Sequence, residues 1–191
     1  MLNGQKGKGR LFVLAGPSGV GKGTLRSRAL ANIDDLTYSI SCTTRAPRAG
    51  EREGRDYRFV SRRDFEDRIA QGLFLEHASV HGNYYGTLRE DVEREIEAGR
   101  DVLLEIDVQG AGQIKEQIPD SVLIFVSPPS LEVLEQRLRQ RKTETEETIR
   151  TRLENAKEEM ERVSEYDYNI LNDVLERAAE ELRGIILGYR K

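Results

Sequence analysis

The stretch that decides the fold reads Gly16-Pro17-Ser18-Gly19-Val20-Gly21-Lys22-Gly23-Thr24, directly after the apolar run at residues 11–15 and directly before a helix-compatible run at residues 25–31. A strand, a glycine-rich turn and a helix start form a cradle for phosphate groups. Glycines let backbone N–H groups converge there, and the helix N-terminus adds partial positive charge. A glycine-rich turn without a ligand would not need Lys22, whose ammonium group reaches the outer phosphates. We therefore predict that the nine quoted residues bind a nucleoside triphosphate.

One position of this loop departs from the usual pattern. Ser or Thr normally follows the lysine, whereas this chain has Gly23 and places Thr24 one residue later. Because that hydroxyl group usually contacts magnesium, we expect the ion to be held mainly by phosphate oxygens and water, with Thr24 at most assisting.

Composition argues against a polyanionic or lipid partner. The 191 residues carry a net charge of −4, so any phosphate must be bound by local positive sites. The apolar runs are far shorter than the roughly 18 residues of a membrane helix, and residues 1–10 lack the apolar stretch of a secretory signal. A single cysteine, Cys42, excludes an intramolecular disulfide. We expect a cytoplasmic enzyme with one core and with no nucleic acid or membrane partner.

Alternating strand and helix patterns predict an α/β fold. Continuous apolar runs predict strands at residues 11–15, 102–106 and 122–126. Each is followed by polar or glycine-rich sequence and then by a helical pattern, which predicts a parallel sheet core with helices on both faces. A weaker strand is expected at residues 168–171, before the last helix.

Two segments interrupt this core pattern. Residues 41–99 combine short alternating pieces with a helix that starts near Ser61, which predicts a small α+β insertion. Residues 130–161 are helix-forming and highly charged, and Thr143 with Glu146 forms a capping box for a second helix. Such a poorly buried helical pair is typical of a mobile lid. The predicted division is a core of residues 9–40, 100–129 and 162–191, an insertion of residues 41–99, and a lid of residues 130–161.

The insertion carries two arginines that suit a phosphate group. Arg45 and Arg48 stand on either side of Pro47, with hydroxyl groups directly upstream. Paired guanidinium groups match a phosphate dianion. Two solvated arginines in a loop would explain this segment equally well if it stood alone. Tyr57 and the turn at residues 82–87 add phenol and hydroxyl groups to the same insertion.

Four motifs together resemble the guanylate kinase family: residues 16–24, Ser41-Cys42-Thr43-Thr44-Arg45-Ala46-Pro47-Arg48, Gly82-Asn83-Tyr84-Tyr85-Gly86 and Leu104-Glu105-Ile106-Asp107-Val108-Gln109-Gly110. Each motif alone is modest, but their order and spacing are specific. The resemblance implies a P-loop core that binds ATP, an insertion that binds GMP and a lid that closes over the phosphates. It also implies Mg²⁺-dependent, in-line transfer of the γ-phosphoryl group from ATP to GMP, giving ADP and GDP without a covalent enzyme intermediate.

By that resemblance, the phosphate of GMP is held by Arg45, Arg48, Tyr57 and Tyr85, and guanine is surrounded by Ser41, Glu76, Thr87 and Asp107. Guanine presents N1–H and a 2-amino group that one carboxylate can accept together, whereas adenine presents the opposite pattern. A site left with unpaired polar groups by the wrong base discriminates by roughly 10⁴ or more. Two alternatives stay open: Glu76 as an outward strand residue, and Thr87 as part of a capping box with Glu90.

The expected catalytic residues are cations that neutralise the transferring group: Lys22, Arg45, Arg137, Arg141 and Arg152. Phosphoryl transfer needs positioned charge more than covalent chemistry. The resemblance assigns the three lid arginines, and the alternative is a solvated charged helix face. Glu105 and Asp107 lie at the end of the strand predicted at residues 102–106. We assign Glu105 with Thr24 to magnesium, in part through water, and the alternative is that Glu105 and Asp107 are ordinary acids at a strand end.

Three other functions compete with this interpretation. Guanylate-kinase-like binding modules of scaffold proteins resemble the same family, but they typically have a degraded P-loop or lid. A different nucleoside monophosphate kinase is suggested by Gly23-Thr24, and Ser41, Glu76 and Tyr85 argue against it. A regulatory GTPase would need an Asn-Lys-x-Asp guanine motif, which this sequence lacks.

Overall fold

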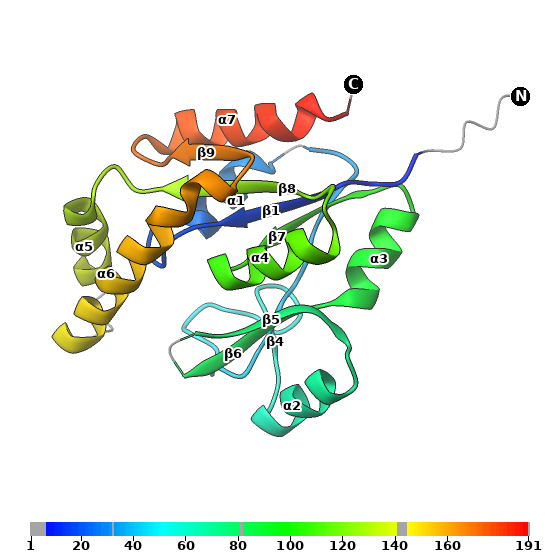
Figure 1. Cartoon of the computed structure of the whole chain (residues 1–191), viewed down its shortest axis with the longest axis horizontal. Coiled ribbons are helices and arrows are strands. Elements are labelled where there is room, and N and C mark those ends of the chain that lie inside the picture. The colour runs from blue at the N-terminus through cyan, green and yellow to red at the C-terminus, as the bar shows by residue number, and fades with distance from the viewer. Residues whose placement is uncertain (1–6, 32, 81, 141–144, 191) are drawn as a thin grey trace, which may run out of the picture. The chain divides into compact units, whose positions relative to one another are not determined.

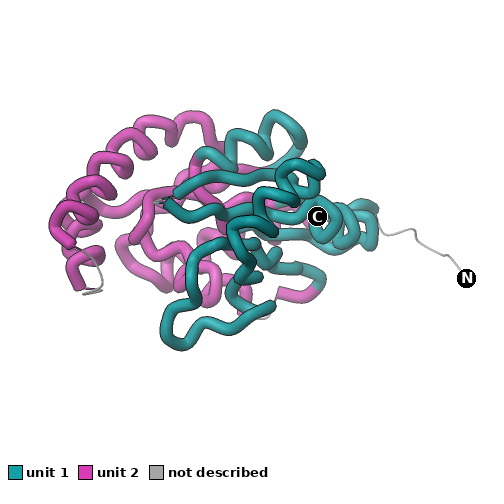
Figure 2. Tube along the Cα trace, turned by 90° about the horizontal axis from the view of Figure 1, so that it is seen from below, with its two compact units in different colours: residues 1–11, 35–104, 109–121 teal, residues 12–34, 105–108, 122–191 magenta. Residues whose placement is uncertain are grey.

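The computed structural model describes residues 7–31, 33–80, 82–140 and 145–190. Its contacts divide the chain into two compact units (Figure 2). The first unit holds residues 1–11, 35–104 and 109–121, and the second holds residues 12–34, 105–108 and 122–191.

Three parallel strands form the sheet of the second unit: β1 (Leu11–Ala15), β8 (Val122–Ser127) and β9 (Tyr168–Leu171) (Figure 1). Leu14 lies opposite Ile124, and Val126 lies opposite Ile170. All five residues of β1 are buried, which explains their unbroken apolar character. Two helices, α1 (Lys22–Ala29) and α7 (Leu175–Gly188), pack against each other beside this sheet.

The charged segment of the second unit forms two helices, α5 (Leu131–Gln140) and α6 (Glu146–Glu161), followed by a 3₁₀ turn, η1 (Arg162–Glu165). The cap of α6 is Thr145, whose hydroxyl oxygen accepts the N–H of Thr148 at 3.3 Å. Thr143, in the predicted capping box, lies outside the described residues. The cap therefore falls two residues later than the sequence pattern placed it.

The first unit contains a parallel pair, β2 (Leu36–Tyr38) with β7 (Asp101–Glu105), of which Glu105 alone falls in the second unit. It also contains a separate small sheet in the order β4-β3-β6-β5. The strands of this small sheet are β3 (Cys42–Thr43), β4 (Arg58–Phe59), β5 (Phe74–Val80) and β6 (Asn83–Leu88). Helix α2 (Arg62–Ala70) begins after its cap Ser61, as predicted. Phe65 of α2 stacks on Phe74 with ring centroids 4.3 Å apart and forms a core with Cys42.

Two further helices belong to this unit, α3 (Arg89–Glu97) and α4 (Val108–Gln117), of which Val108 alone falls in the second unit. The predicted capping box of Thr87 and Glu90 is wrong. Leu88 is the N-cap residue of α3 and no side chain caps the helix, because Thr87 still belongs to β6 and its hydroxyl group has a different partner.

The predicted α/β class is confirmed: a parallel sheet core is flanked by helices. Strands β1 and β9 have the predicted bounds. Strand β7 begins and ends one residue before the predicted range, and β8 ends one residue later. Within the part of the chain that the structure describes, no helix is both long and apolar enough to cross a membrane.

Candidate active site

The glycine-rich loop lies between β1 and α1 in the second unit. Gly16 has a φ of 138°, and a Cβ there would stand 2.4 Å from the carbonyl oxygen of Val126. Gly21 is the N-cap of α1 with a φ of 99°, and a Cβ on it would stand 2.9 Å from the side-chain nitrogen of Asn172. L side chains rarely adopt such φ values. The loop therefore follows a path that these glycines permit and other residues would strain.

Lys22 is the first residue of α1, and its ammonium group lies over the loop. Its Nζ donates to the carbonyl oxygen of Gly16 and, at 3.2 Å, to that of Pro17. The N-terminus of a helix carries partial positive charge and unpaired N–H groups, so an ammonium group here reinforces an anion site. This geometry suits a polyphosphate.

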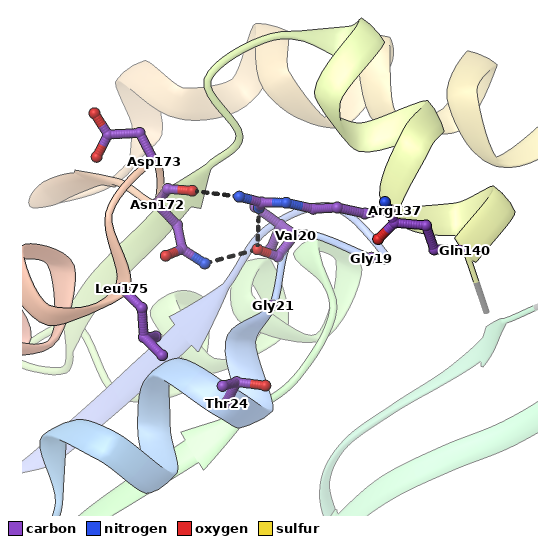
Figure 3. Close-up of a pocket in the computed structure, with 9 residues that line it drawn as sticks. All are labelled: Gly19, Val20, Gly21, Thr24, Arg137, Gln140, Asn172, Asp173 and Leu175. Carbon is purple, nitrogen blue, oxygen red and sulfur yellow. Dashed lines mark hydrogen bonds between the residues drawn. The ribbon is translucent and has the colours of Figure 1, made fainter.

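A cavity of about 370 Å³ opens beside the loop (Figure 3). Its lining residues all belong to the second unit: Gly19, Val20, Gly21, Thr24, Arg137, Gln140, Asn172, Asp173 and Leu175. Arg137 of α5 donates to the carbonyl oxygens of Val20 at 3.0 Å and Asn172 at 2.9 Å. The buried Asn172 side chain donates to the same Val20 oxygen at 2.8 Å. These three bonds tie α5 and the segment after β9 to the loop.

One face of α6 also contacts the loop. Arg152 donates through Nη1 to the hydroxyl oxygen of Ser18 at 3.2 Å. Glu159 lies two helical turns further along the same face. Burial raises the pKa of the Glu159 carboxyl group, while the charge of Lys22 lowers it and that of Asp107 raises it. Glu159 is thus an acidic neighbour of Lys22 that sequence analysis missed, since a glutamate on a charged helix carries no distinctive signal.

The two residues assigned to magnesium lie in the first turn of α1, for Thr24, and beside it, for Glu105. Glu105 forms an ion pair with Arg26, with Oε2 and Nε 3.5 Å apart, and a Cβ on Gly23 would lie in ordinary contact with its carboxylate. Thr24 lines the cavity. Within the described ranges, no three His, Cys, Asp or Glu side chains are grouped to hold a metal by themselves. Carboxylate and hydroxyl oxygens suit Mg²⁺, so these residues fit an ion that is bound mainly by phosphates.

In the first unit, Arg45 is held by a carboxylate. Its Nη1 and Nη2 donate to the two oxygens of Glu51 at 2.8 and 2.9 Å, and its Nε donates to the phenol oxygen of Tyr85 at 3.3 Å. The Arg45 bonds lower the pKa of the Glu51 carboxyl group, and the same pairing raises the pKa of Arg45. The Arg45 guanidinium carbon also lies 5.2 Å from the centroid of the Tyr57 ring. Sequence analysis did not single out Glu51.

The other predicted phosphate contacts surround this arginine. The rings of Tyr57 and Tyr85 meet edge to face with centroids 6.0 Å apart. Arg48 is exposed, and its backbone N–H donates to Glu51 at 2.7 Å. Glu51 therefore joins the segments that carry both arginines, and two phenol rings border Arg45.

Glu76 and Thr87 form a buried polar pair on neighbouring strands. Glu76 of β5 is 3% exposed, and the hydroxyl group of Thr87 on β6 donates to its Oε1 at 2.6 Å. The open alternative of an outward Glu76 is therefore wrong. A buried carboxylate needs hydrogen-bond donors to offset its lost hydration. Ser41, which precedes β3 of the same sheet, is also buried.

The structure brings the predicted residues together in two sets. The first unit contains Ser41, Arg45, Arg48, Tyr57, Glu76, Tyr85 and Thr87, and the second contains the loop, Glu105, Asp107, Arg137 and Arg152. Arg141 lies outside the described residues. Within the second unit, burial and, to a smaller extent, the charge of the predicted Asp107 raise the pKa of Glu159 and that of Tyr166. Gln140 was not predicted and lines the cavity.

A strand, a glycine loop, a lysine at the start of α1 and a parallel α/β core define a P-loop nucleotide-binding protein. The family model for guanylate kinase matches residues 8–189. A guanylate kinase of Desulfitobacterium hafniense is 49% identical over 186 residues, which span 97% of this chain and 93% of that protein. One of Lactococcus lactis is 50% identical over 179 residues, or 94% and 87% of the two chains.

A solved structure is similar over the same length. The crystal structure of guanylate kinase from Anaplasma phagocytophilum has a TM-score of 0.81 and 35% identity, and the match covers 96% of this chain and 87% of that one. The chain belongs to the guanylate kinase family. Its activity is the ATP-dependent phosphorylation of GMP to GDP.

Proposed function

We propose that the chain transfers the γ-phosphoryl group of ATP directly to a phosphate oxygen of GMP, with ATP on the glycine-rich loop and GMP on the small sheet of the first unit. The buried Glu76 carboxylate and its Thr87 donor carry the choice of GMP. No other charged side chain of the β3–β6 sheet is buried among the described residues. A carboxylate that accepts two donors matches the N1–H and 2-amino edge of guanine.

In this proposal, cationic side chains accelerate the phosphoryl transfer. The phosphate of GMP is largely anionic at neutral pH, so its attack needs no strong base. Lys22 binds the outer phosphates of ATP, Arg45 and Arg48 bind the phosphate of GMP, and Arg137, Arg141 and Arg152 stabilise the charge spread over the transferring group. Glu51 and Tyr85 orient Arg45 before GMP binds, which reduces the cost of ordering it.

Magnesium would be held by phosphate oxygens and water, with Thr24 and Glu105 at its margin. When bound, the ion neutralises phosphate charge. We further propose that residues 41–99 act as the GMP-binding insertion and residues 130–161 as the lid of a core formed by residues 9–40, 100–129 and 162–191. The chain would act in the cytoplasm on free nucleotides, without a nucleic acid or membrane partner.

The test is a coupled assay of ADP release with ATP and each of GMP, AMP, CMP and UMP. We expect GMP to be preferred over the next nucleotide by roughly 10⁴-fold or more in kcat/KM. Preference for AMP, CMP or UMP would contradict the assignment of Glu76. A chain that binds GMP but releases no ADP would be a binding module.

Arg137→Ala should lower kcat more than it raises the KM for either substrate. We expect a fall in kcat of about a hundredfold, as for the loss of one positioned donor to a transition state. The wild-type bonds of Arg137 to Val20 and Asn172 place its guanidinium beside the loop. Steady-state kinetics with ATP and GMP varied in turn measures both constants.

Arg139→Ala is the matched control for Arg137→Ala, because Arg139 lies on the same helix but pairs at the surface with Glu135 and Glu146. Its kcat should stay within about twofold of wild type, since exposed ion pairs contribute little. If Arg137→Ala raised KM and left kcat unchanged, Arg137 would contribute to substrate binding and not to stabilising the transition state.

Glu105→Gln and Thr24→Val should raise the magnesium concentration for half-maximal activity by no more than about ten- to a hundredfold, the range for groups that assist a metal without being its principal ligands. Glu105 already pairs with Arg26, and Gly23 stands where the usual hydroxyl ligand would be. Activity titrated with MgCl₂ at fixed ATP measures this concentration. If either variant lost magnesium-dependent activity altogether, that side chain would be a direct ligand.

A further inference from the structure

Strand β5, which carries Glu76, lies at the edge of the small sheet, and two glutamine side chains of α4 bind its backbone. Gln113 makes two bonds to one residue: its Oε1 accepts the N–H of His77 at 3.1 Å, and its Nε2 donates to the carbonyl oxygen of His77 at 2.8 Å. Gln117, one helical turn later, donates through Nε2 to the carbonyl oxygen of Leu75 at 2.8 Å. The two glutamines therefore hold the residues on either side of Glu76.

The pairing of β5 with β6 is irregular at this point. Phe74 lies opposite Leu88 and Glu76 lies opposite Thr87, so Leu75 is an additional residue in the ladder. Such a bulge bends the strand and redirects the side chain that follows it. The carbonyl oxygen of this additional residue is the one that Gln117 binds. Gln117 in turn accepts a bond from Arg89 at 2.7 Å, which orients its amide.

We infer that Gln113, assisted by Gln117, positions Glu76 for guanine and thereby sets base selectivity; this rests on the proposed role of Glu76. The amide of Gln113 substitutes for a neighbouring strand by satisfying both polar groups of His77. The backbone on both sides of Glu76 is thus fixed from the outer edge, while Thr87 fixes its carboxylate from the inner side. Gln113 does not touch the base and acts through Glu76 alone.

Selectivity depends on this placement because the carboxylate must meet two donors at once. Inosine monophosphate (IMP) keeps N1–H but lacks the 2-amino group. The ratio of kcat/KM for GMP over IMP therefore measures the contact of Glu76 with the 2-amino group of guanine. If the strand shifts, the contact with the amino group weakens while general folding and ATP binding do not change.

Gln113→Met keeps the length and packing of the side chain and removes both bonds. We expect the GMP over IMP ratio to fall about three- to tenfold, the size of one or two weakened hydrogen bonds, with the KM for ATP unchanged within about twofold. Glu116→Ala is the matched control, an exposed residue on the same helix, and it should leave the ratio unchanged. Thermal melting checks that each variant is folded at the assay temperature.

A double-mutant cycle separates positioning from general structural damage. In the Glu76→Gln background the side chain no longer accepts both donors of guanine at once, so adding Gln113→Met should change the ratio by less than about twofold. An equal further fall in that background would overturn the inference. If Gln113→Met does not fold, Gln117→Met carries the same test, because Gln117 is exposed and binds the bulge.

The outcomes distinguish this inference from the proposed function. A lower ratio in Glu76→Gln with an unchanged ratio in Gln113→Met would overturn the role of Gln113 and leave that of Glu76 intact. An unchanged ratio in Glu76→Gln would contradict the proposed function and the inference together.

Discussion

Replacing Lys22 by alanine is expected to reduce kcat by at least about a thousandfold, the range observed when a charge that stabilises phosphoryl transfer is removed. Lys22 begins α1, and its ammonium group lies over the carbonyl oxygens of Gly16 and Pro17. Its loss removes a point charge from the outer phosphates. Turnover at saturating ATP, Mg²⁺ and GMP is the measurement. Lys22→Arg should also be poor, because a planar fork does not fit where a compact ammonium group does.

The matched control for Lys22→Ala is Arg28→Ala. Arg28 is a cation on the same helix, but its guanidinium is exposed and 3.9 Å from the carboxylate of Glu176. It should retain turnover within about twofold. Thermal melting of both variants shows whether losing the loop contacts of Lys22 destabilises the fold. Near-wild-type turnover by a folded Lys22→Ala variant would refute the role of this lysine.

Glu76→Gln is expected to lower kcat/KM for GMP by roughly tenfold to a hundredfold or more. The substitution leaves one acceptor and places an amide donor against guanine's N1–H or amino group. It also weakens the acceptor of the bond from Thr87, which measures 2.6 Å in the wild type. AMP should lose much less, because adenine cannot use the same pair. The measurement is the ratio of kcat/KM for GMP over AMP in both proteins.

Glu90→Gln is the matched control, since it makes the same change at an exposed position next to β6 in the sequence. Its ratio should equal that of wild type. If Glu76→Gln were folded and left the ratio unchanged, guanine would be recognised elsewhere, and Ser41, Thr87 and Asp107 would be the residues to test next.

Features that depend on neighbours along the chain could be predicted from the sequence. The glycine spacing at residues 16–21 predicted the turn, and Gly16 and Gly21 have the positive φ values that only glycine adopts readily. Unbroken apolar runs predicted β1 and β8, because strands buried on both faces need apolar side chains throughout. Ser61 predicted the start of α2, since a cap is a contact within four residues.

The tertiary structure determines the partners of those polar side chains whose contacts are distant in the sequence. The sequence allowed Thr87 to cap a helix, but pairing of β5 with β6 brings its hydroxyl group to Glu76 instead. Arg137 finds its acceptors on Val20 and Asn172, far away in the chain. Gln113 reaches His77 only because α4 runs beside the edge of β5. The local sequence pattern cannot predict these hydrogen-bond partners. Burial makes an unpaired polar group costly, and packing determines which partner is within reach.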